Sequence, residues 1–355
     1  MKFFNLDLHI SVIADVKEII ENIGDHQGDN WSISGHAHVM GNPTAKVDVV
    51  NQHNWQQFNL ETPDRFFERY KEELSSYDAF IVTHTPVFSM LYERFNKPII
   101  TIASTRFEAP FSDNKENWNA LNNYLARQID LKKIIPIANN KYDQKYKKMF
   151  TDRDWDVIPS LCEYTDAKYT GKIDKFLYSS KFKHQPKLHK TVDKDTEFQS
   201  GYYWQDLADY KGIIHVPYNV STMSISEQYT ANIPLFFPTW EFLGVLCNSY
   251  GTQGVMSETS WNQIKGLPPQ SKTFAGLDDP NRFDNIPKMM QWYRLSDFYD
   301  PINMPFIQYF NSFRHLNSML QNVDLNEISE KMKEHNAHRK VETYNKWKQK
   351  LKEIE

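Results

Sequence analysis

Strand-like and helix-like segments alternate along most of this chain, and this alternation constrains the fold more than any other feature. Residues 3–10 (FFNLDLHI) read as a strand, and 11–24 as a helix with one apolar face, which we expect Gly24 to end in a left-handed conformation. Residues 78–84 and 97–104 are strand-like, with a helix starting at Pro86 between them. The pattern continues through a strand at 133–139 and a helix at 141–150, and later through strands at 175–180, 212–219 and 232–238. Alternation of this kind predicts an α/β protein with parallel sheets covered by helices on both faces.

The chain of 355 residues is long enough for two domains, each with its own core. The polar, aspartate-rich stretch 151–171 interrupts the alternation and is expected to join them. We predict a Rossmann-like N-terminal domain over 1–155, a second Rossmann-like domain over 165–323, and a charged helix over 324–355. Parallel sheets bind ligands at the carboxyl ends of their strands, so two doubly wound domains are expected to face a central cleft.

Composition excludes several classes of protein. A formal net charge of −4 without a basic block argues against nucleic acid or anionic membrane as a partner. The two cysteines, Cys162 and Cys247, lie too far apart for a zinc knuckle and favour a reducing compartment. Charged residues interrupt any signal-peptide core near the N-terminus, and the apolar run 233–246 is too short to cross a bilayer, so we expect a cytoplasmic protein without a transmembrane segment.

Residues 221–234 (STMSISEQYTANIP) predict a binding site. The hydroxyl residues Ser221, Thr222 and Ser224 stand where a strand ends and a helix begins. A helix N-terminus binds phosphate because its first amides lack partners and the helix dipole is positive there. Glu227, about one turn further on, is suited to accept two hydrogen bonds from a ribose diol. A nucleotide sugar would satisfy both features.

The spacing from Glu227 through Ala231, Asn232 and Ile233 to Pro234, before an apolar strand, resembles the donor-binding signature of GT-B glycosyltransferases. Asn232 stands where that family commonly has glycine, and asparagine tolerates the left-handed turn. The resemblance implies the GT-B fold and transfer of a sugar from a nucleotide-diphosphate donor to a hydroxyl of a glycan or glycoconjugate. It implies no metal and no cofactor besides the donor. In overall look the chain is similar to glycosyltransferases of large DNA viruses and algae.

The resemblance also implies roles for individual residues. Lys181, after the first strand of the second domain, stands where the family often has a basic residue for the diphosphate, and Tyr218 lies beside the hydroxyl cluster. In several inverting members the base lies just after the first strand, which makes His9 and Asp7 the catalytic candidates. The residues expected at the acceptor are His84, Arg106 and His38. Many retaining members carry a second glutamate eight residues before the first; here that position is Asn219, so the motif does not support retention.

Three alternatives compete with this interpretation. Fragments at 7–9, 24–29 and 35–38 resemble pieces of metallophosphoesterases, but they are compressed and lack the asparagine–histidine element of that family. Glycosyltransferases of the other common fold need an Asp-x-Asp after a buried strand, and the candidate pairs at 152/154 and 193/195 do not follow one. A non-catalytic nucleotide- or sugar-binding protein on the same scaffold stays open.

Overall fold

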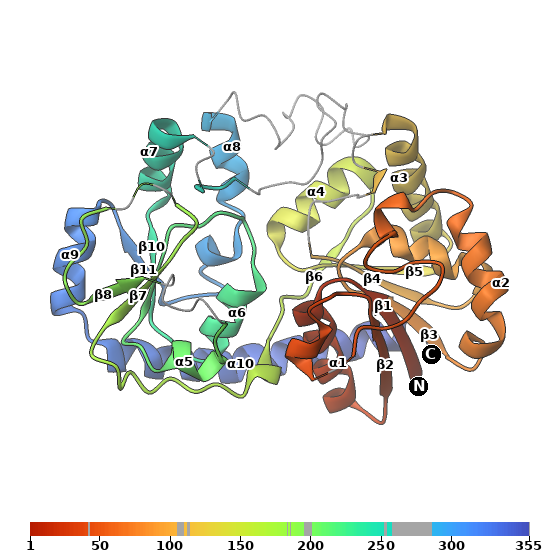
Figure 1. Ribbon diagram of the computed structural model, residues 1–355, viewed down its shortest axis with the longest axis horizontal. Helices are drawn as coiled ribbons and strands as arrows, with labels where there is room; N and C mark the ends of the chain where they lie inside the picture. Colours follow the sequence, from red (N-terminus) through yellow and green to blue (C-terminus); the bar gives the residue numbers. More distant parts are fainter. Residues whose placement is uncertain are drawn as a thin grey trace. The chain divides into compact units, whose positions relative to one another are not determined.

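The computed structural model describes residues 1–41, 43–104, 110–111, 114–182, 184, 186–194, 201–251, 254–257 and 286–354. The described chain divides into two compact units (Figure 1). Unit 1 comprises residues 1–160 and 343–354, and unit 2 comprises residues 161–257 and 286–342. No helix among the described residues is long and apolar enough to cross a membrane.

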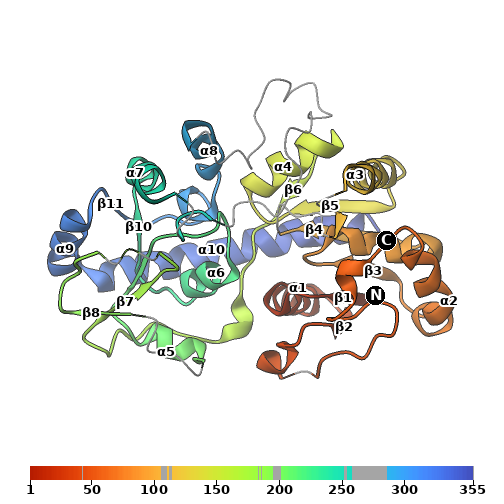
Figure 2. The same cartoon turned by 45° about the horizontal axis from the view of Figure 1, so that its top comes forward.

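Unit 1 is built on one sheet of six parallel strands in the order β2-β1-β3-β4-β5-β6. The strands are β1 (Lys2–Asp7), β2 (Gln27–Ser32), β3 (Ala79–Val82), β4 (Ile99–Ala103), β5 (Ile134–Ala138) and β6 (Asp156–Val157). The helices are α1 (Ile10–Ile23), α2 (Thr62–Leu74), α3 (Lys115–Asp130) and α4 (Lys141–Thr151), with a 3-10 helix η3 (Pro86–Phe95) between β3 and β4. Figure 2 shows α1 and α2 on opposite sides of β1 and β3.

Apolar strand interiors explain why this sheet is covered on both faces. The strands β3 and β4 are buried at every position, so each presents apolar side chains to the helices on either side. Phe80 of β3 stacks on Tyr92 of η3 with ring centroids 4.3 Å apart, and Phe4 of β1 packs edge-on against both rings. These contacts join the strands to η3 in one core.

Unit 2 contains a second parallel sheet, with five strands in the order β11-β10-β9-β7-β8. The strands are β7 (Phe176–Ser179), β8 (Val192–Lys194), β9 (Ile213–His215), β10 (Leu235–Pro238) and β11 (Gln308–Phe310). The helices are α5 (Trp204–Ala208), α6 (Met223–Thr230), α7 (Trp240–Tyr250), α8 (Ile286–Tyr293), α9 (Phe313–Asn322) and the long α10 (Leu325–Lys352).

The two sheets share a strand order. Counted within each unit, both run 2-1-3-4-5, one of the two common doubly wound orders, and unit 1 adds β6 at its edge. In this order the connections leave the first strand in opposite directions, which opens a crevice at the carboxyl ends of the first and third strands. Those strands are β1 and β3 in unit 1, and β7 and β9 in unit 2. The topology therefore gives each unit one expected ligand position.

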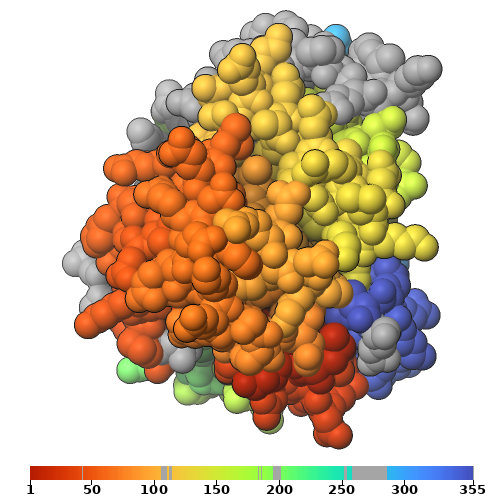
Figure 3. Space-filling model, turned by 90° about the vertical axis from the view of Figure 1, so that its right-hand side faces the viewer, coloured from red at the N-terminus to blue at the C-terminus, as the bar shows by residue number. Residues whose placement is uncertain are grey.

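Helix α10 contributes residues 325–342 to unit 2 and 343–352 to unit 1. Its last turns are anchored in unit 1, where Trp347 and Leu351 are each only 2% exposed and Lys350 pairs with Asp156. In the space-filling view of Figure 3, blue C-terminal residues lie beside the red N-terminal residues.

The predicted fold class, α/β with two doubly wound parallel sheets, is confirmed. The sequence pattern did not predict the edge strands β2, β6, β8 and β11. These strands are short or polar, and an edge strand does not need a run of apolar residues. Gly24 is not left-handed: its φ of 179° is extended backbone, so that prediction was wrong. Asn232 does adopt the left-handed conformation, with a φ of 62°.

Candidate functional site

A cavity of about 180 Å³ lies at the switch point of unit 2. Its walls come from the carboxyl ends of β7 and β9 and from the first turn of α6. The described lining residues are Ser179, Ser180, Lys181, His215, Val216, Pro217, Tyr218, Asn219, Thr222, Ser224 and Ile225. Four of the six predicted donor-binding residues are therefore brought together: Lys181, Tyr218, Thr222 and Ser224.

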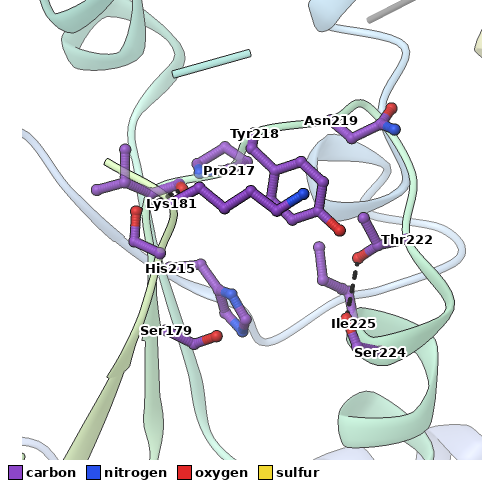
Figure 4. Close-up of a pocket in the computed structure, with 11 residues that line it drawn as sticks. Ser179, Lys181, His215, Pro217, Tyr218, Asn219, Thr222, Ser224 and Ile225 are labelled. Atoms are coloured by element: carbon purple, nitrogen blue, oxygen red, sulfur yellow. Dashed lines mark hydrogen bonds between the residues drawn. The ribbon is translucent and has the colours of Figure 1, made fainter. Parts of the chain in front are cut away.

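Lys181 supplies positive charge to this cavity. Its ammonium lies 3.7 Å from the centroid of the Tyr218 ring, and Figure 4 shows the lysine stem extended across the face of that ring. A cation over an aromatic face is attracted by the ring quadrupole, so Tyr218 orients the lysine without neutralising its charge. An anionic ligand would find that charge already in place.

The N-terminus of α6 supplies the hydroxyl groups. Thr222 is the N-cap residue of α6, yet its side chain does not cap the helix. Instead, its hydroxyl lies 3.2 Å from the Ser224 hydroxyl inside the cavity (Figure 4). A side chain that caps a helix accepts, with its oxygen, a hydrogen bond from one of the first backbone amides of that helix. Here the hydroxyls face the cavity; one of them donates to the other, and the hydroxyl that accepts keeps its own proton to donate to a ligand.

The other two predicted donor residues do not line this cavity. Ser221 donates its hydroxyl to Asp297 at 2.6 Å. Glu227 is 7% exposed, and its carboxylate accepts hydrogen bonds from the Tyr164 hydroxyl and, at 3.1 Å, from the Trp204 indole. A carboxylate has about four acceptor positions, so these bonds do not exclude hydrogen bonds to a ribose. The ribose role of Glu227 stays a prediction.

Sequence reasoning missed His215, Ser179 and Ser180 as cavity residues. His215 ends β9 and is 6% exposed, with Nε2 lying 2.7 Å from Oε1 of Gln228. The signal that could have found them is topological, since all three lie at the carboxyl ends of the two strands that flank the switch point. That signal needs the strand order, which the sequence pattern alone does not provide.

Asp7 organises the switch point of unit 1. It is fully buried at the end of β1, and one oxygen of its carboxylate accepts the backbone N–H groups of Thr83, His84 and Thr85 at 3.0, 2.9 and 3.2 Å. The other oxygen accepts the Leu8 amide at 2.7 Å. Asp7 thereby fixes the turn that follows β3.

A chain of hydrogen bonds connects Asp7 to the imidazole of His84. The Thr85 hydroxyl donates to Asp7 at 2.9 Å, so it can only accept from Nδ1 of His84, which lies 3.1 Å away. Nδ1 of His84 therefore carries a proton, and in the neutral ring Nε2 is an acceptor. This arrangement resembles the base-plus-orienting-group geometry of general-base catalysis, with a threonine inserted between the two.

His9 lies beside His84, with ring centroids 5.0 Å apart. Its Nδ1 is buried and has no hydrogen-bond partner among the described residues. Burial, reinforced by the neighbouring His84, lowers the pKa of His9 to about 3. His9 is consequently neutral at pH 7 but is a weak proton acceptor.

The remaining predicted residues lie elsewhere. His38 is exposed on a short 3-10 helix (Ala37–Met40), with Nδ1 3.2 Å from the Gly35 carbonyl. Arg106 lies outside the described residues. In the part of the chain that the structure describes, no group of three or more His, Cys, Asp or Glu residues could hold a metal ion.

The described residues of the candidate Asp-x-Asp pairs have ordinary structural contacts. Asp152 ends α4 in a left-handed conformation, and Asp154 pairs with Lys148 at 2.5 Å. Asp193, on the edge strand β8, pairs with Lys175 at 2.7 Å, while the residue at 195 lies outside the described residues.

Comparisons with known proteins give a limited result. No protein-family model matches the sequence, and no curated protein matches it. Among solved structures, the chain is similar to the glycotransferase of kitacinnamycin, with a TM-score of 0.46, 8% identity and 98% of each chain covered. It is also similar to the glycosyltransferase VinC in complex with dTDP, with a TM-score of 0.35, 10% identity and 93% and 100% coverage. For the spinosyn forosaminyltransferase SpnP the TM-score is 0.33, with 10% identity and 91% and 100% coverage. Similarity at this level does not by itself establish an activity.

Proposed function

We propose that this protein is a GT-B-type glycosyltransferase that moves a sugar from a nucleoside diphosphate to a hydroxyl acceptor. One observation carries the proposal: the cavity of unit 2 combines Lys181, two hydroxyl groups and a helix N-terminus at the switch point of a parallel sheet. These are the groups that bind a diphosphate. The second switch point, in unit 1, holds imidazoles that suit deprotonation of an acceptor.

Binding of the donor is tested by Lys181→Met, which keeps the stem over Tyr218 and removes the charge. Hydrogen bonds to charged groups contribute about 1.5 to 3 kcal/mol, so the affinity for a nucleoside diphosphate should fall about tenfold or more. Titration calorimetry with UDP, dTDP, GDP and ADP would measure it. Lys187→Met, at an exposed lysine of the same unit, is the control and should leave affinity unchanged. Equal affinities in all three proteins would refute the site.

The geometry of unit 1 favours His84 as the base. In the proposed step, Nε2 of His84 takes the proton of the acceptor hydroxyl while the oxygen of that hydroxyl forms a bond to the anomeric carbon. The bond from that carbon to the diphosphate breaks, and the nucleoside diphosphate leaves with the electron pair. Asp7 and Thr85 orient the imidazole and do not touch the substrates. His9, with its lowered pKa, is the second candidate.

Loss of a general base commonly lowers turnover about a hundredfold or more. We expect His84→Gln to do so with the Km of the donor little changed. Thr85→Val keeps the shape of the side chain but breaks the hydrogen-bond chain, and should lower kcat while nucleotide affinity stays constant. If His9→Gln abolishes turnover and His84→Gln does not, the sequence-based choice of His9 is the correct one.

A further inference from the structure

We infer that His215 is a fixed hydrogen-bond acceptor in the cavity of unit 2, which selects a ligand hydroxyl or N–H at that position and disfavours a phosphate oxygen. The inference rests on the proposed function, because a nucleotide sugar carries both kinds of group. No sequence motif singles out His215. Its role follows from two contacts of the ring, with Phe237 and with Gln228.

The plane of the ring is held by stacking. His215 stacks on Phe237 of the neighbouring strand β10, with centroids 4.8 Å apart and planes 20° from parallel. Phe237 in turn stacks on Phe298 at 4.6 Å and 13°. Because all three side chains are buried, the imidazole has little freedom to turn. The directions of its two nitrogens are therefore set by the fold.

The tautomer is set by Gln228 of α6. Its amide oxygen lies 2.7 Å from Nε2 of His215, and an amide oxygen only accepts, so Nε2 carries the proton. Nδ1 is then left with its lone pair. His215 lines the cavity, and no bond to Nδ1 is found among the described contacts. The cavity consequently contains an acceptor nitrogen next to the end of β9.

The charge state agrees with this geometry. Burial, which outweighs the bond to Gln228, lowers the pKa of His215 to about 4. At pH 7 the ring is neutral, so Nδ1 stays an acceptor. Lys181 is the charged side chain among the described lining residues. A bound diphosphate should therefore lie towards Lys181 and the α6 hydroxyls, with a sugar hydroxyl at His215.

The first experiment measures the tautomer directly. The chain has 12 histidines, so long-range ¹H–¹⁵N spectra of the full-length protein, labelled at histidine, are assigned by comparison with His215→Phe. We expect a neutral ring with the proton on Nε2 at pH 7. A proton on Nδ1, or a charged ring, would overturn the inference. This measurement needs no ligand, so its result is independent of the proposed function.

The second experiment separates the ligand groups. Calorimetry compares three probes: inorganic diphosphate, the nucleoside diphosphate that wild type binds, and its glucose conjugate. His215→Phe keeps the stacked ring but removes the acceptor, and should weaken a hydroxyl-bearing probe about fivefold or more while leaving inorganic diphosphate unchanged. A loss of affinity already seen with the nucleoside diphosphate would show that His215 binds the ribose. A loss of affinity confined to the conjugate would show that His215 binds the transferred sugar. Equal effects on all three probes, or no effect on any of them, would contradict the inference that His215 selects a hydroxyl.

The third experiment reverses the preference. In Gln228→Glu a carboxylate faces Nε2 and favours the charged ring, which turns Nδ1 into a donor. Binding of inorganic diphosphate should become tighter and binding of the conjugate weaker; a variant with the affinities of wild type would contradict the inference. His335→Phe, at a histidine of unit 2 outside the cavity, is the control and should change neither. If wild type binds no nucleotide at all, the proposed function fails, while the tautomer still decides the state of His215.

Discussion

At the scale of single residues, His9 makes the stability of this protein depend on pH. Its pKa is about 3 in the folded chain and near 6.5 in the unfolded chain. Between these values the unfolded chain binds a proton that the folded chain does not, so the folded state loses stability as the pH falls below about 6.5. The slope from one such group is at most about 1.4 kcal/mol per pH unit.

We therefore expect His9→Leu to flatten the pH dependence of unfolding between about pH 6 and 4. Urea denaturation midpoints for both proteins across that range would test this. His215, whose pKa is also lowered, remains in both proteins and contributes the residual slope. Parallel curves for wild type and variant would show that His9 titrates normally in the folded protein.

Gly254 is a second residue whose effect follows from local geometry. Its φ is +91°, and a Cβ built there would lie 2.1 Å from the carbonyl oxygen of Lys181. A side chain at this position would push the backbone of a cavity residue. Gly201 has nearly the same φ, +93°, but a Cβ there would meet nothing within 4 Å. An alanine at Gly201 would therefore introduce backbone strain alone, whereas an alanine at Gly254 would add the clash with Lys181.

Gly201→Ala should lower the free energy of unfolding by about 1 to 2 kcal/mol, the cost of a left-handed alanine. Gly254→Ala should cost more and should also weaken nucleotide binding, because the Lys181 backbone must shift. Denaturation and calorimetry on both variants measure the difference. Identical losses of stability, with nucleotide affinity intact, would mean that the Lys181 segment moves aside without consequence.

At the scale of secondary-structure elements, α6 is held at one end and offers the other to the cavity. Asn336 of α10 donates to the Tyr229 carbonyl and to the Asn232 side chain at 2.9 and 2.8 Å, and Ser329 donates to the Asn232 carbonyl at 2.9 Å. These bonds fix the C-terminal end of α6. The position of Thr222 and Ser224 at its N-terminus therefore depends on α10 as well as on the sheet.

Glu227, in the middle of α6, ties the helix to the segment that begins unit 2. Tyr164→Phe removes the bond from the Tyr164 hydroxyl to the Glu227 carboxylate and should lower the free energy of unfolding by about 1 to 3 kcal/mol, with no loss of nucleotide affinity. Glu227→Gln should lower stability as well. The ribose role adds a separate expectation for this variant, a loss of affinity of about tenfold or more. If calorimetry finds that Glu227→Gln binds the nucleotide with full affinity, Glu227 only anchors α6 and does not bind the ribose.

At the scale of the whole molecule, the proposed reaction relies on protein cations and helix amides to neutralise the diphosphate. Lys181 and the N-terminus of α6 supply that charge. We expect sugar transfer, or slow hydrolysis of the donor, to survive EDTA with less than about a twofold change, since charge-assisted bonds replace a metal. Loss of activity in EDTA, restored by magnesium or manganese, would favour a metal-dependent alternative.

Much of the fold could be predicted from the sequence because local chemistry determines it. Apolar runs such as 79–82 and 99–103 form buried strands wherever the chain places them, and the alternation with helices makes the sheets parallel. The hydroxyl cluster at the start of α6 and the left-handed Asn232 were predictable for the same reason, since each depends on a few neighbouring residues. The polar edge strands carry no such local signal.

Only the tertiary structure decided which of these residues meet. The order of the strands places Asp7 against Thr83–Thr85, which lie more than 70 residues further along the chain. This contact is the reason why we propose His84 as the base in place of His9. It also sets His215 beside Lys181, and places Tyr164 and Trp204 against Glu227. A spacing pattern reports which face a residue shares with its near neighbours in sequence. Contacts between distant strand ends depend on how the whole sheet is ordered, and the sequence pattern does not contain that order.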